Sequence, residues 1–258
     1  MLKYKWAVLS LDIKNVINKA GFQTFFRALL DHDTNEYKDL QLLVTLSKWF
    51  WDTTCTFHFL GIGEVMLKPY DFLTITGLKL GGKRIEGNDS ISSVEIRGLL
   101  GVMPPWVRSK NVPLMWLYTN IDKCETIATG TRMFMLLFIG TLLCPDLGST
   151  VILCYLWSLR VINQIKNYDW GGMAYVTLFH FITQLSRQSL SSLGGAPFVW
   201  QVRFKFLVVY FVKVICVLLM LMCADFFFLG LDVWIFWCWS TTFGRCWWHV
   251  SKVSSLAA

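Results

Sequence analysis

Apolar residues recur at every third or fourth position through most of the first 200 residues, which places them on one face of a helix. Each such stretch is short, so the helices must pack against one another to be stable. The pattern predicts helices over residues 9–22, 23–31, 34–52, 68–78, 92–101, 113–121, 125–143, 149–165 and 171–188.

Several of these helices carry residues that favour a start or an end at a defined place. Ser10 can accept a hydrogen bond as the N-cap of the first helix, and Gly21 can end it. Thr34 can cap the third helix. Pro69 suits the first turn of the fourth helix, and Gly77 suits its C-terminal end.

The spacing changes from helical to alternating in the stretch "CTFHFLGIGEVML", residues 55–67. Cys55, Phe57 and Phe59 alternate with polar residues, and the two glycines of "LGIG" can form a turn, so a β-hairpin is expected. A second hairpin is expected over residues 78–87, around two adjacent glycines. The predicted fold class is mainly α (α+β), a helical domain with one or two short hairpins.

His58 and Glu64 in the first hairpin resemble an acid–base pair. They could act together only if their side chains lie on the same face of the hairpin. A regular pairing with Phe59 opposite Glu64 places His58 opposite Val65. Because successive side chains of a strand point to opposite faces, His58 and Glu64 are then expected on different sides of the hairpin. The pair is therefore interpreted as structural, with no shared proton or metal ion.

The sequence contains none of the common motifs of enzymes or metal sites. It has no GxxxxGK[ST], GxGxxG, HExxH or GxSxG motif, and its eight cysteines form no CxxC or zinc-finger spacing. The triplet Asp31-His32-Asp33 lies in a polar turn, where these residues are common, and His180 lies beside an apolar stripe. We therefore predict no catalytic, cofactor-binding or metal-binding residues and no cofactor.

The net charge of +7 is spread along the chain, and Lys83-Arg84 is the only adjacent basic pair. A nucleic-acid arm has denser clustering of basic residues, so a solvated surface of mixed charge is the preferred interpretation. Nucleic-acid contact is left open by the sequence, and protein partners are expected without being identified.

Two blocks of the sequence resemble the plant mobile domain family, also called aminotransferase-like, which includes the MAINTENANCE OF MERISTEMS proteins. The first block is "LSKWFWDTTCTFHFLGIGEVMLKPYDFLTITGLKLGGKRIEG", and the second runs from Arg132 to Arg187. The resemblance covers residues 11–201. The residues that carry it, called the pattern residues below, are Trp49, Thr56, Phe57, His58, Gly63, Glu64, Asp71, Gly77, Leu78, Gly82, Arg132, Gly140, Pro145, Asp146, Leu156, Tyr168, Trp170 and Gly171.

The resemblance implies a protein without enzymatic activity. It implies a nuclear interaction protein linked to meristem maintenance, meristem development, genome stability and transposon silencing. It also implies an incomplete domain, because the family's domain continues past the helix that begins at "FVWQ", whereas the similarity here stops near Gln201. An enzyme with an unrecognised site is the remote alternative, which the missing motifs disfavour.

Residues 202–258, called the hydrophobic tail below, differ from the rest of the chain. They contain no proline, four of the eight cysteines and five of the thirteen tryptophans. Residues 206–224 form an apolar run with Lys213 as its one charge, long enough for a transmembrane helix. Lys213 at mid-span costs about 2.5–3.5 kcal/mol, which the surrounding Leu, Val, Ile and Phe can offset.

Two interpretations of the hydrophobic tail follow. The chain is a single-pass membrane protein of the same family, or the tail is translated intron sequence. We prefer the second, because T- and G-rich noncoding DNA yields many Phe, Leu, Val, Cys and Trp codons and the resemblance stops where a splice donor could be read through. Sequencing the spliced transcript across codon 201 distinguishes them.

We predict that the full-length chain partitions into membranes or aggregates, whereas a chain ending at Gln201 is more soluble. Residues 206–224 should form a helix, and the apolar surface of this helix exceeds the few hundred Å² that soluble monomers tolerate. Fractionation and gel filtration of the two chains check this. A full-length chain that purifies as a monomer without detergent would contradict both the membrane interpretation and the expectation that the tail makes the chain misfold.

Overall fold

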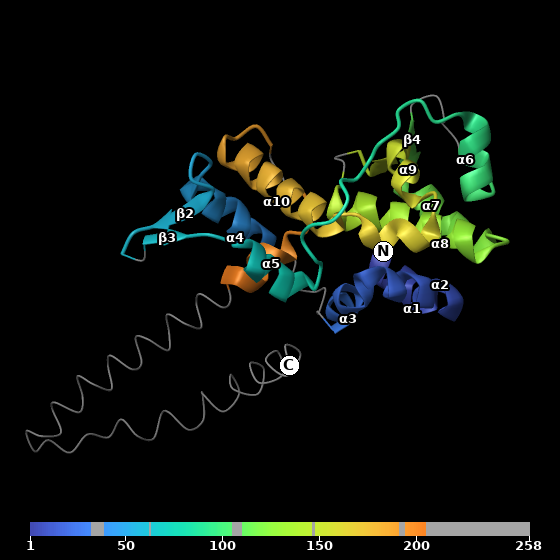
Figure 1. Ribbon diagram of the computed structural model, residues 1–258. Coiled ribbons are helices and arrows are strands. Elements are labelled where there is room, and N and C mark those ends of the chain that lie inside the picture. The colour runs from blue at the N-terminus through green and yellow to red at the C-terminus, as the bar shows by residue number, and fades with distance from the viewer. Residues whose placement is uncertain (32–38, 62, 105–109, 146–147, 191–193, 205–258) are drawn as a thin grey trace, which may run out of the picture. The chain divides into compact units, whose positions relative to one another are not determined.

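The structure is a computed structural model of the chain that describes residues 1–31, 39–61, 63–104, 110–145, 148–190 and 194–204 (Figure 1). Its contacts divide the chain into two compact units, Met1–Val202 and Arg203–Ala258. The clefts and sites described below all lie in the first unit. The helix expected over residues 206–224 lies outside the described residues.

Helices make up most of the described part of the first unit, which confirms the mainly helical class predicted from the sequence. The α-helices are α1 (Leu2–Val8), α2 (Leu11–Ile17), α3 (Gln23–Asp31), α4 (Asp39–Leu46), α5 (Pro69–Thr76), α6 (Ser93–Leu100), α7 (Leu114–Asn120), α8 (Ile127–Phe138), α9 (Leu156–Leu159) and α10 (Trp170–Ser186). Short π- and 3-10 segments are η1 (Asn18–Phe22), η3 (Ser47–Trp49), η5 (Ile121–Lys123), η6 (Ile139–Leu143), η7 (Leu153–Tyr155) and η8 (Ile162–Asn167). Among the described residues, no helix is both long and apolar enough to cross a membrane.

Two small antiparallel sheets accompany the helices. The first contains β1 (Phe50–Trp51), β2 (Thr56–Phe59) and β3 (Gly63–Val65) in that order, so the hairpin predicted over residues 55–67 is confirmed. The second pairs β4 (Asn111–Pro113) with β5 (Thr150–Ile152).

Helix boundaries follow the capping residues seen in the sequence. The Ser10 hydroxyl accepts a hydrogen bond from the Ile13 amide at 3.5 Å, and Gly21 has a φ of 96° where η1 leads into α3. Pro69 occupies the first turn of α5, and Gly77 ends α5 with a left-handed φ of 69°. Thr34 lies outside the described residues, and α1 was not predicted.

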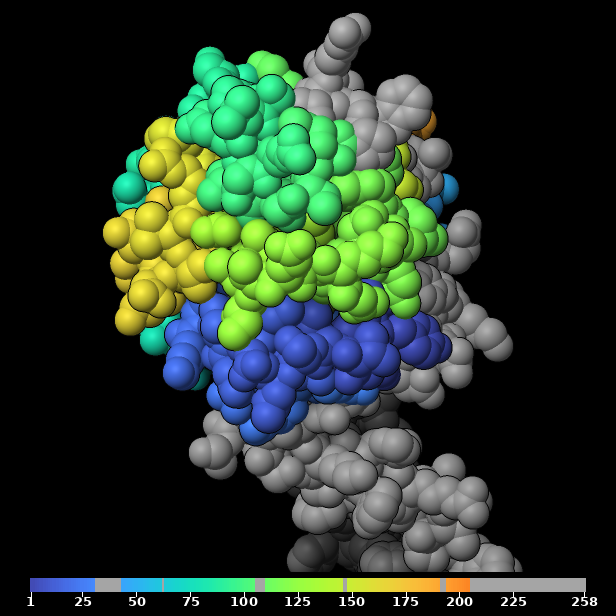
Figure 2. Space-filling view, turned by 90° about the vertical axis from the view of Figure 1, so that its right-hand side faces the viewer, coloured from blue at the N-terminus to red at the C-terminus, as the bar shows by residue number. Residues whose placement is uncertain are grey.

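Helix α8 is the centre of the core. The seven residues from Met133 to Ile139 are each at most 1% exposed, as expected of a helix that is apolar on all sides. Helices α2, α6 and α7 pack against α8. Figure 2 shows the N-terminal helices (blue) below, and α6 (green) above, the yellow-green layer of α7 and α8.

The prediction of one continuous helix over residues 149–165 is wrong. The chain instead forms β5, then the 3-10 segment η7, the short helix α9 and the 3-10 segment η8. The start of this stretch, Thr150-Val151-Ile152, consists of β-branched residues that favour a strand. Val151 pairs with Val112 of β4, and both side chains are buried, so tertiary packing overrides the helical spacing.

The prediction of a second hairpin over residues 78–87 is also wrong. The Lys83 amide donates a hydrogen bond to the Asn167 carbonyl at 2.7 Å, and the Asp169 amide donates to the Lys83 carbonyl at 2.9 Å. A Cβ on Gly82 would lie 2.7 Å from the Asn167 oxygen. The glycine therefore permits a close approach to a distant segment rather than a local turn.

Aromatic rings join the first hairpin to α10 and to the helical segment that starts at residue 198. Phe57 of β2 meets the Trp200 ring edge-on at a centroid distance of 5.2 Å, and Phe179 of α10 meets it at 5.4 Å. Phe57 and Trp200 are at most 1% exposed. This cluster fixes the hairpin on the body of the unit.

We predict that Gly171→Ala lowers the free energy of unfolding by about 1–3 kcal/mol, because the added Cβ would overlap the Lys79 carbonyl oxygen. Gly98→Ala is the matched control, because Gly98 also lies in a helix and its Cβ would meet no atom within 4 Å. That change should raise stability by about 0.5–1 kcal/mol. Urea unfolding followed by circular dichroism measures both, and equal shifts for the two variants would contradict the prediction.

Candidate functional site

Arg132 of α8 makes the most extensive polar contacts of the pattern residues. Its guanidinium donates hydrogen bonds to three backbone carbonyls, Leu99 and Leu159 at 3.1 Å each and Arg160 at 2.9 Å. Burial lowers the pKa of this guanidinium from its usual value. The side chain thereby ties the ends of α6 and α9 to the central helix.

The glycines among the pattern residues lie where other groups approach the backbone closely. A Cβ on Gly77 would lie 2.6 Å from the Thr24 side chain, and a Cβ on Gly140 would lie 2.6 Å from Leu114. Gly171 faces the Lys79 carbonyl, and Gly82 faces Asn167. Gly63 differs, since its surroundings are open and only its φ of 92° favours glycine.

Several other pattern residues outside the hairpin cap helices or fill the core, whereas Trp49 does neither. The Asp71 carboxylate accepts a hydrogen bond from the Lys68 amide at 3.0 Å at the start of α5. The Trp170 indole donates to the Ile165 carbonyl at 2.8 Å, and Leu78 is buried. Trp49, at the end of η3, is 47% exposed.

The predicted placement of His58 and Glu64 on different faces is wrong. The observed register pairs Phe57 with Val65, His58 with Glu64 and Phe59 with Gly63. The loop is therefore residues 60–62, one residue shorter than expected, and positive φ angles at Gly61 and Gly63 permit it. A shift of one residue moves side chains to the other face, so His58 and Glu64 lie side by side.

His58 belongs to a small polar cluster on one face of the hairpin. Its Nε2 lies 2.9 Å from the Thr56 hydroxyl and 3.3 Å from the Thr54 hydroxyl, and its Nδ1 lies 3.8 Å from a Glu64 carboxylate oxygen. The imidazole stacks on Trp51 with a centroid distance of 4.0 Å. Hydroxyl, imidazole and carboxylate thus follow the order of a hydrolase triad.

The cluster is better suited to holding the hairpin together than to catalysis. Thr56 is 6% exposed, and its hydroxyl lies 2.6 Å from that of Thr54. A nucleophile must be reached by its substrate, and this hydroxyl is shielded. The Nδ1–Glu64 distance of 3.8 Å is also too long for the hydrogen bond that would orient a catalytic base.

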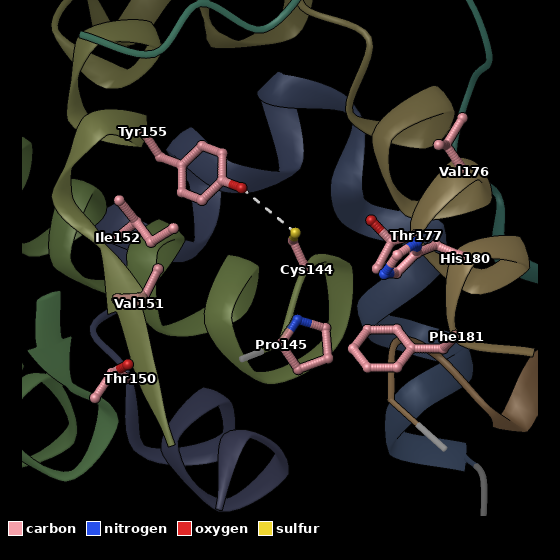
Figure 3. Close-up of a pocket in the computed structure, with 10 residues that line it drawn as sticks. All are labelled: Cys144, Pro145, Thr150, Val151, Ile152, Tyr155, Val176, Thr177, His180 and Phe181. Atoms are coloured by element: carbon pink, nitrogen blue, oxygen red, sulfur yellow. Dashed lines mark hydrogen bonds between the residues drawn. The ribbon is translucent and has the colours of Figure 1, made fainter. Parts of the chain in front are cut away.

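A cleft of about 380 Å³ lies elsewhere, between α10 and the segment from η6 to η7 (Figure 3). Its lining residues are Cys144, Pro145, Thr150, Val151, Ile152, Tyr155, Val176, Thr177, His180 and Phe181. The Tyr155 hydroxyl donates a hydrogen bond to the Cys144 sulfur at 3.4 Å, and His180 stands on the opposite wall. Burial, and then the contact with Cys144, raise the pKa of Tyr155 well above its usual value.

This cleft can hold a small, largely apolar group with a few polar contacts. His180 is exposed, in agreement with its predicted place beside the apolar stripe rather than on it. Cys144 and Tyr155 were not singled out in the sequence, because the walls come from segments about 30 residues apart and carry no motif.

A second cleft of about 250 Å³, the Lys83–Arg160 groove, is lined by Lys83, Glu86, Trp157, Arg160, Val161, Gln164 and Tyr168. The Arg160 guanidinium lies 4.1 Å from the centroid of Trp157, and the Lys83 ammonium lies 5.4 Å from that of Tyr168. Glu86 pairs with Lys83 at 3.1 Å and raises its pKa. The groove therefore presents two cations held against aromatic faces.

Metal ligands do not gather in the part of the chain that the structure describes. No group of three or more His, Cys, Asp or Glu residues there could hold a metal ion. The triplet at 31–33 falls mostly outside the described residues, so its interpretation as a turn stays a prediction.

The fold and these sites define a mainly helical domain with two small antiparallel sheets, in which several pattern residues bind backbone groups. The chain belongs to the family described as "Domain of unknown function (DUF8566)", which matches residues 6–201. It is 26% identical over 167 residues to "Serine/threonine-protein phosphatase 7 long form homolog" of Arabidopsis thaliana. That match covers 61% of this chain and 12% of the relative's length. No solved structure matches the chain.

We predict that His58→Ala lowers the free energy of unfolding by about 1–2 kcal/mol, because the variant loses the Trp51 stack and the hydroxyl contacts. Glu64→Ala should cost less than about 1 kcal/mol, because its ion pair is solvent-exposed. His58→Phe is the matched control that retains stacking and should lose less than His58→Ala. Urea unfolding measures all three. A purified activity that either alanine variant abolishes while remaining folded would contradict the structural interpretation.

Proposed function

We propose that the chain is a non-enzymatic interaction protein of the plant mobile domain type that acts in the nucleus. The distant relation to an Arabidopsis protein and the sequence resemblance over residues 11–201 support this proposal. Meristem maintenance, genome stability and transposon silencing are the processes that the resemblance suggests. The relative's name refers to a phosphatase, but the match covers 12% of its length, so this proposal does not carry that activity over.

The observation that carries the proposal is the distribution of the pattern residues. Of those that the structure describes, only Pro145 lines the 380 Å³ cleft and only Tyr168 lines the Lys83–Arg160 groove. Arg132 is engaged with three backbone carbonyls, and Asp71 caps α5. A sequence pattern that marks an enzyme is expected to place its polar residues together in a cleft. Here the pattern marks residues that build a scaffold.

The first hairpin offers a surface for a protein partner. Leu60, in its loop, is 94% exposed, and Trp49 of η3 and Trp51 of the neighbouring strand β1 are 47% and 56% exposed. Aromatic residues are enriched in protein interfaces, and exposed apolar residues favour association. The hairpin is fixed on the body by Phe57, so it would meet a partner without reordering.

Imaging and complementation in plant cells test the proposal. We expect the tagged full-length chain in the nucleus and expect it to restore transposon silencing in cells that lack the endogenous copy. A Leu60→Ser, Trp51→Ser variant should lose the silencing activity while remaining nuclear. The control is Val8→Ser, Leu11→Ser, which alters two residues that are 70% and 71% exposed on other elements. Localisation of the full-length chain to membranes, with no nuclear signal, would contradict the proposal and favour the membrane-anchored alternative.

A further inference from the structure

The Lys83–Arg160 groove brings together two segments that lie about 75 residues apart in the sequence. The Lys83–Asn167 and Asp169–Lys83 backbone hydrogen bonds join one side, and the Ser158 hydroxyl contacts the Glu86 backbone amide and carbonyl at 2.9 Å each on the other. The Asp169 carboxylate also accepts a hydrogen bond from the Gly81 amide at 3.0 Å. The positions of the groove's side chains are therefore set by the backbone.

The two joined segments, residues 79–86 and 157–169, combine their positive charges in one place. They contain five exposed cations against two carboxylates, those of Glu86 and Asp169. The five are Lys79, Lys83, Arg84, Arg160 and Lys166. Lys83 of the adjacent basic pair thus lines the same groove as Arg160 of a distant segment.

The groove combines this charge with planar side-chain groups, an indole ring and a guanidinium. The Arg160 guanidinium lies 4.1 Å from the centroid of the Trp157 ring, and Arg160 is exposed. Bases stack on aromatic rings and on guanidinium planes, and cations beside them bind the phosphates. Gln164, also in the lining, can donate to and accept from a base edge.

We propose that the Lys83–Arg160 groove binds single-stranded nucleic acid, with a base stacked on the Trp157–Arg160 pair and phosphates held by Lys83 and neighbouring cations. An acidic protein segment would use the charges but would not need the flat stacked pair. This site is separate from the hairpin surface and does not depend on the proposed function.

The test measures fluorescence anisotropy of a labelled oligothymidylate of about 20 nucleotides with the full-length chain, in a mild detergent shared by all variants. We expect Lys83→Ala, Arg160→Ala to weaken binding at least about tenfold and to reduce the slope of log affinity against log salt by about 1.4, the value for two phosphate contacts on a single strand. The control is Lys48→Ala, Lys123→Ala, which removes the same charge from η3 and η5. It should keep nearly all of the affinity.

A second pair of variants separates stacking from charge. Trp157→Ala should weaken binding by about tenfold, whereas Trp157→Phe, which retains an aromatic face, should restore most of it. Circular dichroism melting confirms that each variant is folded. No binding of the oligothymidylate, an equal loss in the Lys48/Lys123 control, or equally tight binding of polyglutamate that Trp157→Ala leaves unchanged would overturn the proposal.

Discussion

The Arg132 guanidinium is the interaction on which most of the unit's arrangement depends. It is half-buried on the central helix α8 and donates to the carbonyls of Leu99, Leu159 and Arg160. A buried charge without partners is costly, so the segments that supply these carbonyls are held in place as long as Arg132 stays charged. Only arginine presents enough donors in a fixed plane to bind three groups at once.

The consequences of this contact reach the Lys83–Arg160 groove. Arg132 fixes the end of α9, which carries Trp157 and Arg160 of the groove. Glycines then allow the chain around residues 79–83 to lie directly against residues 167–171. The groove is thus a product of backbone packing. The hairpin depends on a different set of contacts, the rings of Phe57, Phe179 and Trp200.

Much of this fold could be predicted from the sequence, because local signals and tertiary packing agree in most helices. The Ser10, Pro69 and Gly77 boundaries and the buried face of α10 are examples. The predictions failed over the exact length of a loop and over contacts between distant segments. The register of His58 depends on one residue in a loop, and Gly82 serves a contact with Asn167 that no local pattern reveals.

The two clefts could not be predicted for a related reason. Each is lined by residues from separate segments, and no residue type in either segment is unusual for a surface or a core. The sequence showed one basic pair, Lys83-Arg84, and only the structure places Arg160 and Trp157 beside it. The pattern residues were visible in the sequence, but their contacts with backbone groups were not.

Hydrogen exchange of an Arg132→Lys variant tests the central claim most directly. Lysine retains the charge but cannot bind the three carbonyls in one plane. Our account predicts faster exchange of backbone amides in residues 157–169 and at Lys83, with the hairpin strands β2 and β3 unchanged. Unchanged exchange throughout, or an equal increase in the hairpin, would show that Arg132 does not organise this part of the fold.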